Sequence, residues 1–317
     1  MVTVVVTGAT GGIGRSVVPL LAARGAEVVA SGRDTAIGRT LEGPGIRFVP
    51  AELTSDDLAP LLHGASAVVH LAARSSPWGK LEEFESDNMR ATARLLDAAA
   101  AAGVGRFVHA STPAIFAERR HRLDLRAASP PAARPVNHYA RTKLAAETLV
   151  AQETRMATLI LRPSAVIGPH DRAILPRLLR VLKRGVLPVG NGGAALFQPT
   201  DARDAAEAFA ASVFGTVTGV ATVAGREAVS LVETARSLAR RLGLPLRVRA
   251  VPEPALHALA TAMEGFGAVS GLEPPLTRYS AAILSWSRTF DLADTEALIG
   301  WRPRYGAGDT LERALAQ

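Results

Sequence analysis

The sequence contains no cysteine among its 317 residues, and aromatic residues make up only 5% of it. The missing thiols exclude a disulfide framework, thiolate metal sites, iron–sulfur clusters and a cysteine nucleophile. The seven histidines show no HExxH spacing, so we expect no protein-bound metal. No GxSxG turn occurs either, and without it a serine hydrolase lacks its nucleophile elbow. Catalysis therefore has to use hydroxyl, imidazole, carboxylate or lysine groups.

Long apolar runs and clustered basic runs are missing as well. No stretch reaches the roughly 18 apolar residues that span a bilayer, so we expect no membrane partner. The net charge is +7, but the arginines are scattered and no basic run is interleaved with aromatics, so we expect no nucleic-acid partner. A β-rich run begins at Val2 and leaves no room for a signal peptide, which predicts a cytoplasmic protein.

The composition, 48% hydrophobic and 21% charged, is typical of a folded globular protein. Short β-branched runs alternate with longer segments rich in alanine and leucine, a pattern that indicates crossover units in a parallel sheet. We predict strands at Thr3–Thr7, Glu27–Ala30, Arg47–Val49, Ala67–Leu71, Arg106–Ala110, Thr158–Arg162 and Val220–Ala224. We predict helices at Ile13–Arg24, Glu85–Ala102, Tyr139–Thr154, Leu231–Leu242 and Leu256–Phe266.

The alternation loosens after Ile167, where prolines and a glycine-rich stretch interrupt it. We therefore predict a nucleotide-binding domain formed by residues 1–166 plus 200–224. A smaller, largely C-terminal substrate-binding lobe is predicted from residues 167–199 plus 225–317. Within this lobe, the spacing of Leu256, Leu259, Met263 and Phe266 predicts a helix whose apolar face packs into the core.

The first predicted strand runs directly into the sequence TGATGGIG, and a predicted helix follows. Glycines at this spacing make a tight turn, let the backbone approach a pyrophosphate and pack the helix against the strand. The order of strand, loop and helix distinguishes this loop from a chance glycine triplet. We therefore expect a Rossmann-type, doubly wound α/β fold that binds a dinucleotide through Gly8, Thr10, Gly11, Gly12, Ile13 and Gly14.

The second predicted strand leads into Ser31-Gly32-Arg33-Asp34. A cofactor with a free ribose 2′-hydroxyl usually meets an acid at the position that Gly32 occupies here. The planar fork of Arg33 can instead pair with a 2′-phosphate, which favours NADP (NADPH) over NAD. The alternative interpretation of Arg33 is a solvated loop arginine.

Tyr139 and Lys143 lie four positions apart in a predicted helix, in a chain with only three tyrosines and three lysines. Positions i and i+4 share a helix face, so the ammonium can stabilise the phenolate and make Tyr139 a general acid or base. The fifth predicted strand is followed by Ser111 and Thr112, which places hydroxyls at the carboxyl edge of the sheet. Thr112 can hold a substrate carbonyl there, or it can cap the backbone.

Together these motifs resemble the extended short-chain dehydrogenase/reductase family, of the NAD-dependent epimerase/dehydratase type, and they occur in that family's order. The resemblance implies that Thr112 and Tyr139 bind a carbonyl oxygen and that Asn88 supports a proton relay. It implies that Lys143 holds the nicotinamide ribose and lowers the pKa of Tyr139. It implies a homodimer through the two long helices that contain Asn88 and Tyr139. Further cofactor contacts are implied at Glu52, Leu53, Leu71, Ala72, Ala73, Lys143 and Pro163.

Two departures separate this sequence from the sugar-nucleotide members of the family. Pro163-Ser164-Ala165 stands where those members usually have an asparagine, and the segment 195–198 has no arginine to hold a diphosphate. The tail, with Pro274-Pro275 and Gly300-Trp301-Arg302-Pro303, resembles 3β-hydroxysteroid dehydrogenase-like and 2-alkyl-3-ketoalkanoate reductase-like members, which handle largely apolar substrates. The candidate substrate contacts are Arg74, Trp78, Ser111 and Phe197.

The sequence therefore predicts an NADP-dependent ketoreductase or alcohol dehydrogenase that acts on a largely apolar small-molecule ketone or alcohol. Tyr139 is its predicted general acid/base. One alternative is a sugar-nucleotide epimerase, dehydratase or 4-ketoreductase, which would show no net NADPH consumption if it were redox-neutral. A second alternative is a non-catalytic, NADP-binding regulatory protein, although such a protein has no need for an activated phenol.

Overall fold

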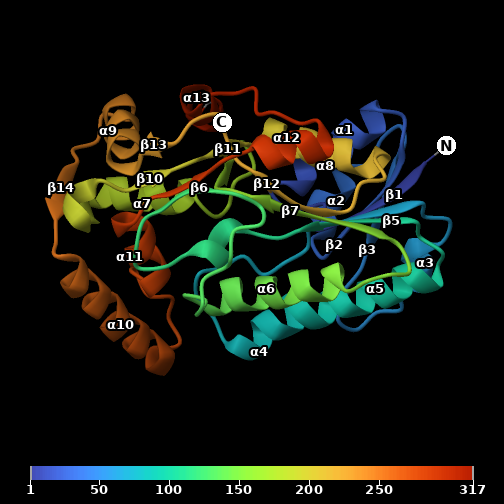
Figure 1. Cartoon of the computed structure of the whole chain (residues 1–317), viewed down its shortest axis with the longest axis horizontal. Coiled ribbons are helices and arrows are strands. Elements are labelled where there is room, and N and C mark those ends of the chain that lie inside the picture. The colour runs from blue at the N-terminus through green and yellow to red at the C-terminus, as the bar shows by residue number, and fades with distance from the viewer. Residues whose placement is uncertain (1, 316–317) are drawn as a thin grey trace.

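The computed structural model describes residues 2–315, and a seven-stranded parallel sheet lies at its centre (Figure 1). From one edge to the other, the strands are β12 (Gly219–Val223), β7 (Ala157–Pro163), β5 (Arg106–Ala110), β4 (Ala67–His70), β1 (Thr3–Thr7), β2 (Glu27–Gly32) and β3 (Ile46–Pro50). The strand order reverses between β1 and β4, which makes the sheet doubly wound and puts its ligand-binding switch point beside β1. All seven predicted strands are confirmed, and the Rossmann-type fold with them.

Two helical layers cover the sheet because its strands are apolar on both faces. One layer contains α1 (Gly14–Ala23), α8 (Ala202–Phe214) and α12 (Ala293–Ile299). The other layer contains α3 (Ala59–Leu62), α5 (Ala91–Ala101) and α6 (His138–Ala151), and Figure 1 shows α5 and α6 running side by side. Shorter helices are α2 (Thr35–Arg39), α4 (Leu81–Phe84) and the π-helix η1 (Glu85–Arg90), which continues into α5.

The remaining elements lie beyond the carboxyl edge of the sheet or pack on its flank. The helices among these elements are α7 (Leu175–Arg184), α9 (Leu231–Arg241), α10 (Glu253–Ser270), α11 (Arg278–Ser285) and α13 (Ala307–Leu315), with 3-10 turns η2 (Pro113–Phe116) and η3 (Asn191–Gly193). Short strands pair as β6 (Arg122–Leu125) with β15 (Arg288–Phe290), β8 (Val166–Ile167) with β11 (Thr200–Asp201), β9 (Val186–Val189) with β14 (Arg247–Ala250), and β10 (Leu196–Phe197) with β13 (Val229–Ser230). Among residues 2–315, no helix combines the length and apolar character that a membrane crossing requires.

Helix α10 corrects one expectation about the core. Leu256 is buried as predicted, but Leu259 is 48% exposed and Phe266 is 70% exposed. The two acids of the helix face inward instead, where Glu253 pairs with Arg119 and Glu264 pairs with Arg278. Helix α10 therefore buries one face that combines Leu256 with these two ion-paired acids, whereas the predicted apolar positions Leu259 and Phe266 face outward.

Candidate active site

The glycine-rich loop follows β1 and brings the N-terminus of α1 to the carboxyl edge of the sheet. Gly8 has φ +68°, and a Cβ there would lie 2.5 Å from the backbone nitrogen of Ala72. A Cβ at Gly14 would lie 2.3 Å from the carbonyl oxygen of Gly8. Neither position can therefore hold a larger residue without moving backbone, and the loop keeps a close turn at the N-terminus of α1, the end of a helix that favours an anion.

A cleft of about 360 Å³ opens beside this loop. The predicted cofactor contacts that line it are Gly8, Thr10, Gly11, Arg33, Glu52, Leu53, Leu71, Ala72 and Ala73. Gly12, Ile13, Gly14 and Pro163 do not line it; Gly12 lies under the carbonyl oxygen of His170, and Pro163 ends β7. The glycine cradle, the helix N-terminus and the elongated set of lining residues fit a dinucleotide.

Arg33 stands at this cleft with a 64% exposed side chain. Its guanidinium lies 3.5 Å from the carboxylate of Glu52 and 3.8 Å from that of Asp87. Asp34 also lines the cleft, and one of its carboxylate oxygens accepts a hydrogen bond from the Ile37 amide and caps α2. Arg33 is therefore the one basic group that β2 and its following loop contribute to the lining of the cleft.

Tyr139 and Thr112 meet where α6 begins, beside the end of β5. Asn137 caps α6 by accepting a hydrogen bond from the Ala140 amide. Thr112 caps η2 by accepting a 3.1 Å hydrogen bond from the Ala114 amide, and its hydroxyl lies close enough to Tyr139 to affect the pKa of the phenol. Burial raises the pKa of Tyr139 to about 12, although the Thr112 contact opposes the rise, and nearby Tyr279 adds to it. Tyr139 is therefore a protonated hydroxyl across the neutral range.

Lys143 differs from the expectation that it lowers the pKa of Tyr139. Its side chain is only 1% exposed, and its Nζ lies 3.1 Å from Nε2 of His109. Burial lowers the pKa of Lys143 to about 7, partly offset by the Glu147 charge. The ammonium is directed at the neighbouring strand β5, and the rise in the pKa of Tyr139 shows that burial dominates at the phenol.

Asn88 lies in the π-helical segment η1, a type of irregularity that often marks functional sites. Its side-chain amide donates to Thr142 at 3.0 Å and to the carbonyl of Arg74, while its oxygen accepts from the Arg74 amide at 2.8 Å. Asn88 thus fastens α6 to the loop after β4, one residue away from Lys143. Its contact with the catalytic pair runs through Thr142, and its part in a proton relay stays a prediction.

The four candidate substrate contacts are distributed unevenly. Trp78 is half-buried and packs beside Gly267 of α10. Phe197 of β10 pairs with Val229 of the antiparallel strand β13, and Arg74 is engaged by the carboxylates of Asp87 and Glu83. Ser111 departs most from its expected role, because its hydroxyl is buried and bonds to Glu147. The strand end points this hydroxyl into the core, leaving Thr112 as the hydroxyl beside Tyr139.

Sequence reasoning gave no role to five residues of this region: Asp87, Arg172, Tyr279, His70 and His109. Asp87 and Arg172 line the cleft, and Tyr279 affects the pKa of Tyr139. The two histidines lie at the carboxyl ends of β4 and β5, where ligand sites of such sheets form, so their positions were a usable signal. Arg172 and Tyr279 come from segments whose placement over the sheet only the fold supplies.

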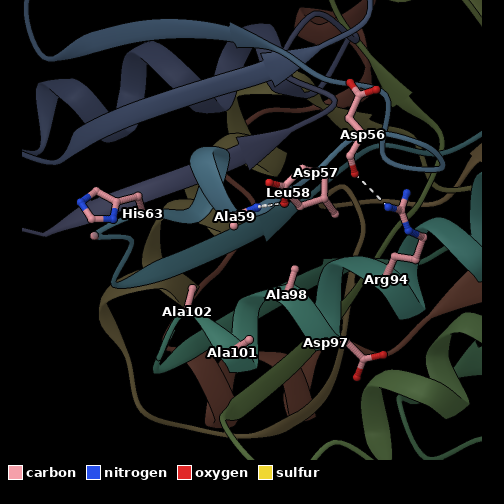
Figure 2. A pocket seen from close by; sticks show the side chains of 11 residues that line it. Asp56, Asp57, Leu58, Ala59, His63, Arg94, Asp97, Ala98, Ala101 and Ala102 are labelled. Atoms are coloured by element: carbon pink, nitrogen blue, oxygen red, sulfur yellow. Dashed lines mark hydrogen bonds between the residues drawn. The ribbon is translucent and has the colours of Figure 1, made fainter.

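A second cavity, of about 580 Å³, lies between α3 and α5 and contains none of the predicted site residues (Figure 2). Its floor is formed by Ala98, Ala101 and Ala102. Arg94 crosses one end and donates hydrogen bonds to the carbonyls of Leu53 and Asp56. Arg94 thereby fixes the loop after β3, which presents Glu52 and Leu53 to the cofactor cleft. Within residues 2–315, no three metal-ligating side chains gather at one place.

The fold and the cleft agree with comparisons to known proteins. The model of the NAD dependent epimerase/dehydratase family matches residues 4–214. The chain belongs to this family. It is accordingly an NAD(P)-dependent enzyme of the oxidoreductase, epimerase and dehydratase group that constitutes the extended short-chain dehydrogenase/reductases.

Relatives in this family point to more than one chemistry. Uncharacterized protein YbjS of Escherichia coli is 34% identical over 99% of this chain and 96% of its own length. A 2-alkyl-3-oxoalkanoate reductase of Stenotrophomonas maltophilia is 27% identical over 99% of this chain and 98% of its own. Among solved structures, MoeE5 in complex with UDP-glucuronic acid and NAD matches with a TM-score of 0.76 and 26% identity, over 98% of this chain and 97% of that one.

Proposed function

We propose that this family member is an NADP-dependent ketoreductase or alcohol dehydrogenase for a largely apolar ketone or alcohol. The observation that carries the proposal is the Tyr139 hydroxyl, which neighbours Thr112 at the start of α6, beside the end of β5 at the carboxyl edge of the sheet. A bound nicotinamide supplies or accepts the hydride. Tyr139 then gives its proton to the carbonyl oxygen that Thr112 helps to hold. A pKa of about 12 keeps Tyr139 protonated at neutral pH, so the proton that reduction requires is present.

The segment around Gln198 supports this substrate class over sugar nucleotides. Gln198 is buried, its amide donates to the Gly225 carbonyl at 2.7 Å, and its oxygen accepts from the Phe290 amide at 2.9 Å. Both halves of the side chain are therefore committed, and no cation stands in the segment 195–198 to hold a diphosphate. The full-length similarity to a 2-alkyl-3-oxoalkanoate reductase supports the same class.

A sugar-nucleotide epimerase or dehydratase is the second candidate, because MoeE5 is described with UDP-glucuronic acid and NAD. The deciding experiment measures net NADPH oxidation by the purified protein over polycyclic ketones, β-keto esters and nucleotide-linked ketosugars. We expect turnover of an apolar ketone. Turnover confined to nucleotide sugars, or their interconversion without net NADPH oxidation, would overturn the proposal. The absence of turnover with all three substrate classes, together with tight NADPH binding, would favour a non-catalytic regulatory protein.

The preference for NADP rests on the loop after β2. A Cβ at Gly32 would lie 2.8 Å from Oγ1 of Thr10, so an acid cannot occupy this position without displacing Thr10. We expect Arg33→Glu to raise the KM for NADPH about 10- to 100-fold more than the KM for NADH, because a charge-assisted bond to the 2′-phosphate is lost. Arg39→Glu is the matched control, since Arg39 is 69% exposed on α2 and pairs with Glu42. Equal effects of Arg33→Glu on both cofactors would refute the 2′-phosphate contact.

We further propose that the active form is a homodimer through the helix pair α5 and α6. The motivation is the family resemblance together with the parallel course of these helices on one face of the molecule. Sedimentation at micromolar concentration should give the mass of two chains, and a monomer mass would contradict this assembly. The division into a nucleotide-binding domain and a substrate-binding lobe stays part of the same proposal.

A further inference from the structure

The buried end of Lys143 has one hydrogen-bond partner among the described residues, the Nε2 atom of His109 at 3.1 Å. The nearest acid, Glu147, lies one helical turn further along α6. Both of its oxygens are engaged, because Arg162 donates to each of them and Ser111 adds a bond to one. The carboxylate that would neutralise Lys143 is thus committed to another cation, and the imidazole of His109 takes its place at the lysine.

The chemistry of this contact fixes the state of the imidazole. An ammonium group has three donors and no acceptor, so Nε2 of His109 has to present its lone pair and the proton has to sit on Nδ1. Nδ1 is buried and has no hydrogen-bond partner among residues 2–315. Leaving a buried N–H unpaired is unfavourable. The ring is nevertheless held in this orientation, in which the Lys143 contact is the one polar interaction it makes.

A second histidine holds the ring of His109 in place. The centroids of His70 and His109 lie 5.2 Å apart, with the rings tilted by 40°. Both nitrogens of His70 are bonded, to Thr7 at 2.7 Å and to Thr92 at 3.0 Å. Burial, with a smaller effect of the Lys143 charge, lowers the pKa of His70 to about 3 and holds that of His109 well below 6.5. Both histidines therefore stay neutral throughout the working pH range.

The other described groups around Lys143 neither neutralise its charge nor place an unpaired positive charge beside it. Tyr139, one turn earlier on α6, is a neutral phenol. Arg162 on β7 is cationic but paired with Glu147. We propose that His109 is a positioning residue whose Nε2 accepts a hydrogen bond from the ammonium form of Lys143, which stabilises that form and fixes the side chain. The consequence for turnover rests on the function proposed above, whereas the contact itself does not.

The lysine content of the chain makes a direct test possible, since only Lys80, Lys143 and Lys183 occur. Protein labelled at lysine Cε, free of cofactor, gives three NMR signals, and Lys143→Arg assigns the relevant one. We expect the Lys143 signal to titrate near pH 7 in the unaltered protein. His109→Leu should lower this midpoint by about one pH unit, because an acceptor for the ammonium is lost.

Two isosteric variants separate the hydrogen bond from packing. In His109→Gln the amide group reaches the position of Nε2, so we expect the midpoint to return toward that of the unaltered protein. In His109→Asn the amide reaches only the position of Nδ1, so we expect the lowered midpoint to persist. An unchanged midpoint in His109→Leu or His109→Asn, with a thermal transition like that of the unaltered protein, would overturn the proposal.

The unaltered protein supplies a readout that does not depend on any variant folding. Recorded at a pH below the Lys143 midpoint, its ¹⁵N-histidine spectrum should show His109 protonated at Nδ1 and bare at Nε2, and the opposite tautomer at that pH would overturn the proposal. Should a ketone substrate be found, the high-pH limb of kcat should move to lower pH in His109→Leu and return in His109→Gln. If no ketone is turned over but the NMR midpoint shifts as expected, the proposed function fails while the role of His109 stands.

Discussion

A Tyr139→Phe variant should lose about a thousandfold in kcat while its Kd for NADPH changes little, since a positioned general acid contributes on the order of 10² to 10⁴ in rate. The substitution removes a single hydroxyl, the one beside Thr112 at the sheet edge. The lining of the cofactor cleft does not include Tyr139, so dinucleotide binding should survive the change. NADPH oxidation at saturating ketone gives kcat, and quenching or enhancement of NADPH fluorescence gives Kd.

The matched control is Tyr305→Phe, which makes the same chemical change outside the site. The Tyr305 ring lies beneath the guanidinium of Arg203, 3.3 Å from ring centroid to guanidinium carbon, and that contact uses the ring face rather than the hydroxyl. We expect kcat of this variant to stay within about twofold of the unaltered enzyme. Retention of more than a few per cent of kcat in Tyr139→Phe would remove Tyr139 from the role of acid.

The central sheet was predictable because its signal is local. Strand β1 is a run of β-branched residues, and Val4, Val5 and Val6 are all fully buried, as expected of a strand with helices on both faces. The glycines were also predictable from their spacing in the loop. Gly14 is required because it approaches the backbone of Gly8 in the same loop, and Gly8 is required because it approaches the backbone that follows β4. The approximate location of the site at the carboxyl edge followed from these elements and from the Tyr139 and Lys143 spacing.

The contacts that decide what each site residue does could not be predicted in the same way, because they join distant parts of the chain. Ser111 bonds to Glu147, 36 positions later, and Lys143 meets His109, 34 positions earlier. A strand-end hydroxyl can point into the core or into the cleft, and a shift of one residue reverses the choice. Ser111 takes one of these two orientations and Thr112 takes the other, and only the fold shows which residue takes which orientation.

Helix α10 shows a different limit of sequence reasoning. Its apolar spacing predicted a buried face, yet Phe266 is mostly exposed and Glu264 is buried. The partner that makes burial of Glu264 favourable is Arg278, which comes from the next helix and binds it through Nε and the backbone amide. A buried carboxylate is acceptable only when it is paired and hydrogen-bonded. Hydrophobic spacing contains no information on such a partner, so it placed Leu256 correctly on the buried face but Phe266 incorrectly.

Glu147→Gln should destabilise the protein by about 3–5 kcal/mol, because it leaves the Arg162 guanidinium buried without its counter-ion. The side chains of this pair are 7% and 8% exposed, and they are joined by two hydrogen bonds of 2.9 and 2.7 Å. Arg162 keeps a bond to the Ala127 carbonyl and a place over the Phe116 ring, which cannot replace a carboxylate. For a chain of this size we expect a fall in Tm of roughly 5–8 °C, measured by calorimetry.

The exposed pair of Arg241 and Glu312 provides the control, since Glu312 is 56% exposed and its loss should cost at most about 1 kcal/mol. Adding Arg162→Met to Glu147→Gln tests the cause directly. If the loss comes from an unpaired buried charge, removing that charge should restore part of the stability, since apolar replacements of buried pairs are often neutral or stabilising. A double variant that is less stable than Glu147→Gln alone would show instead that Arg162 contributes chiefly through its packing on Phe116 and its bond to Ala127.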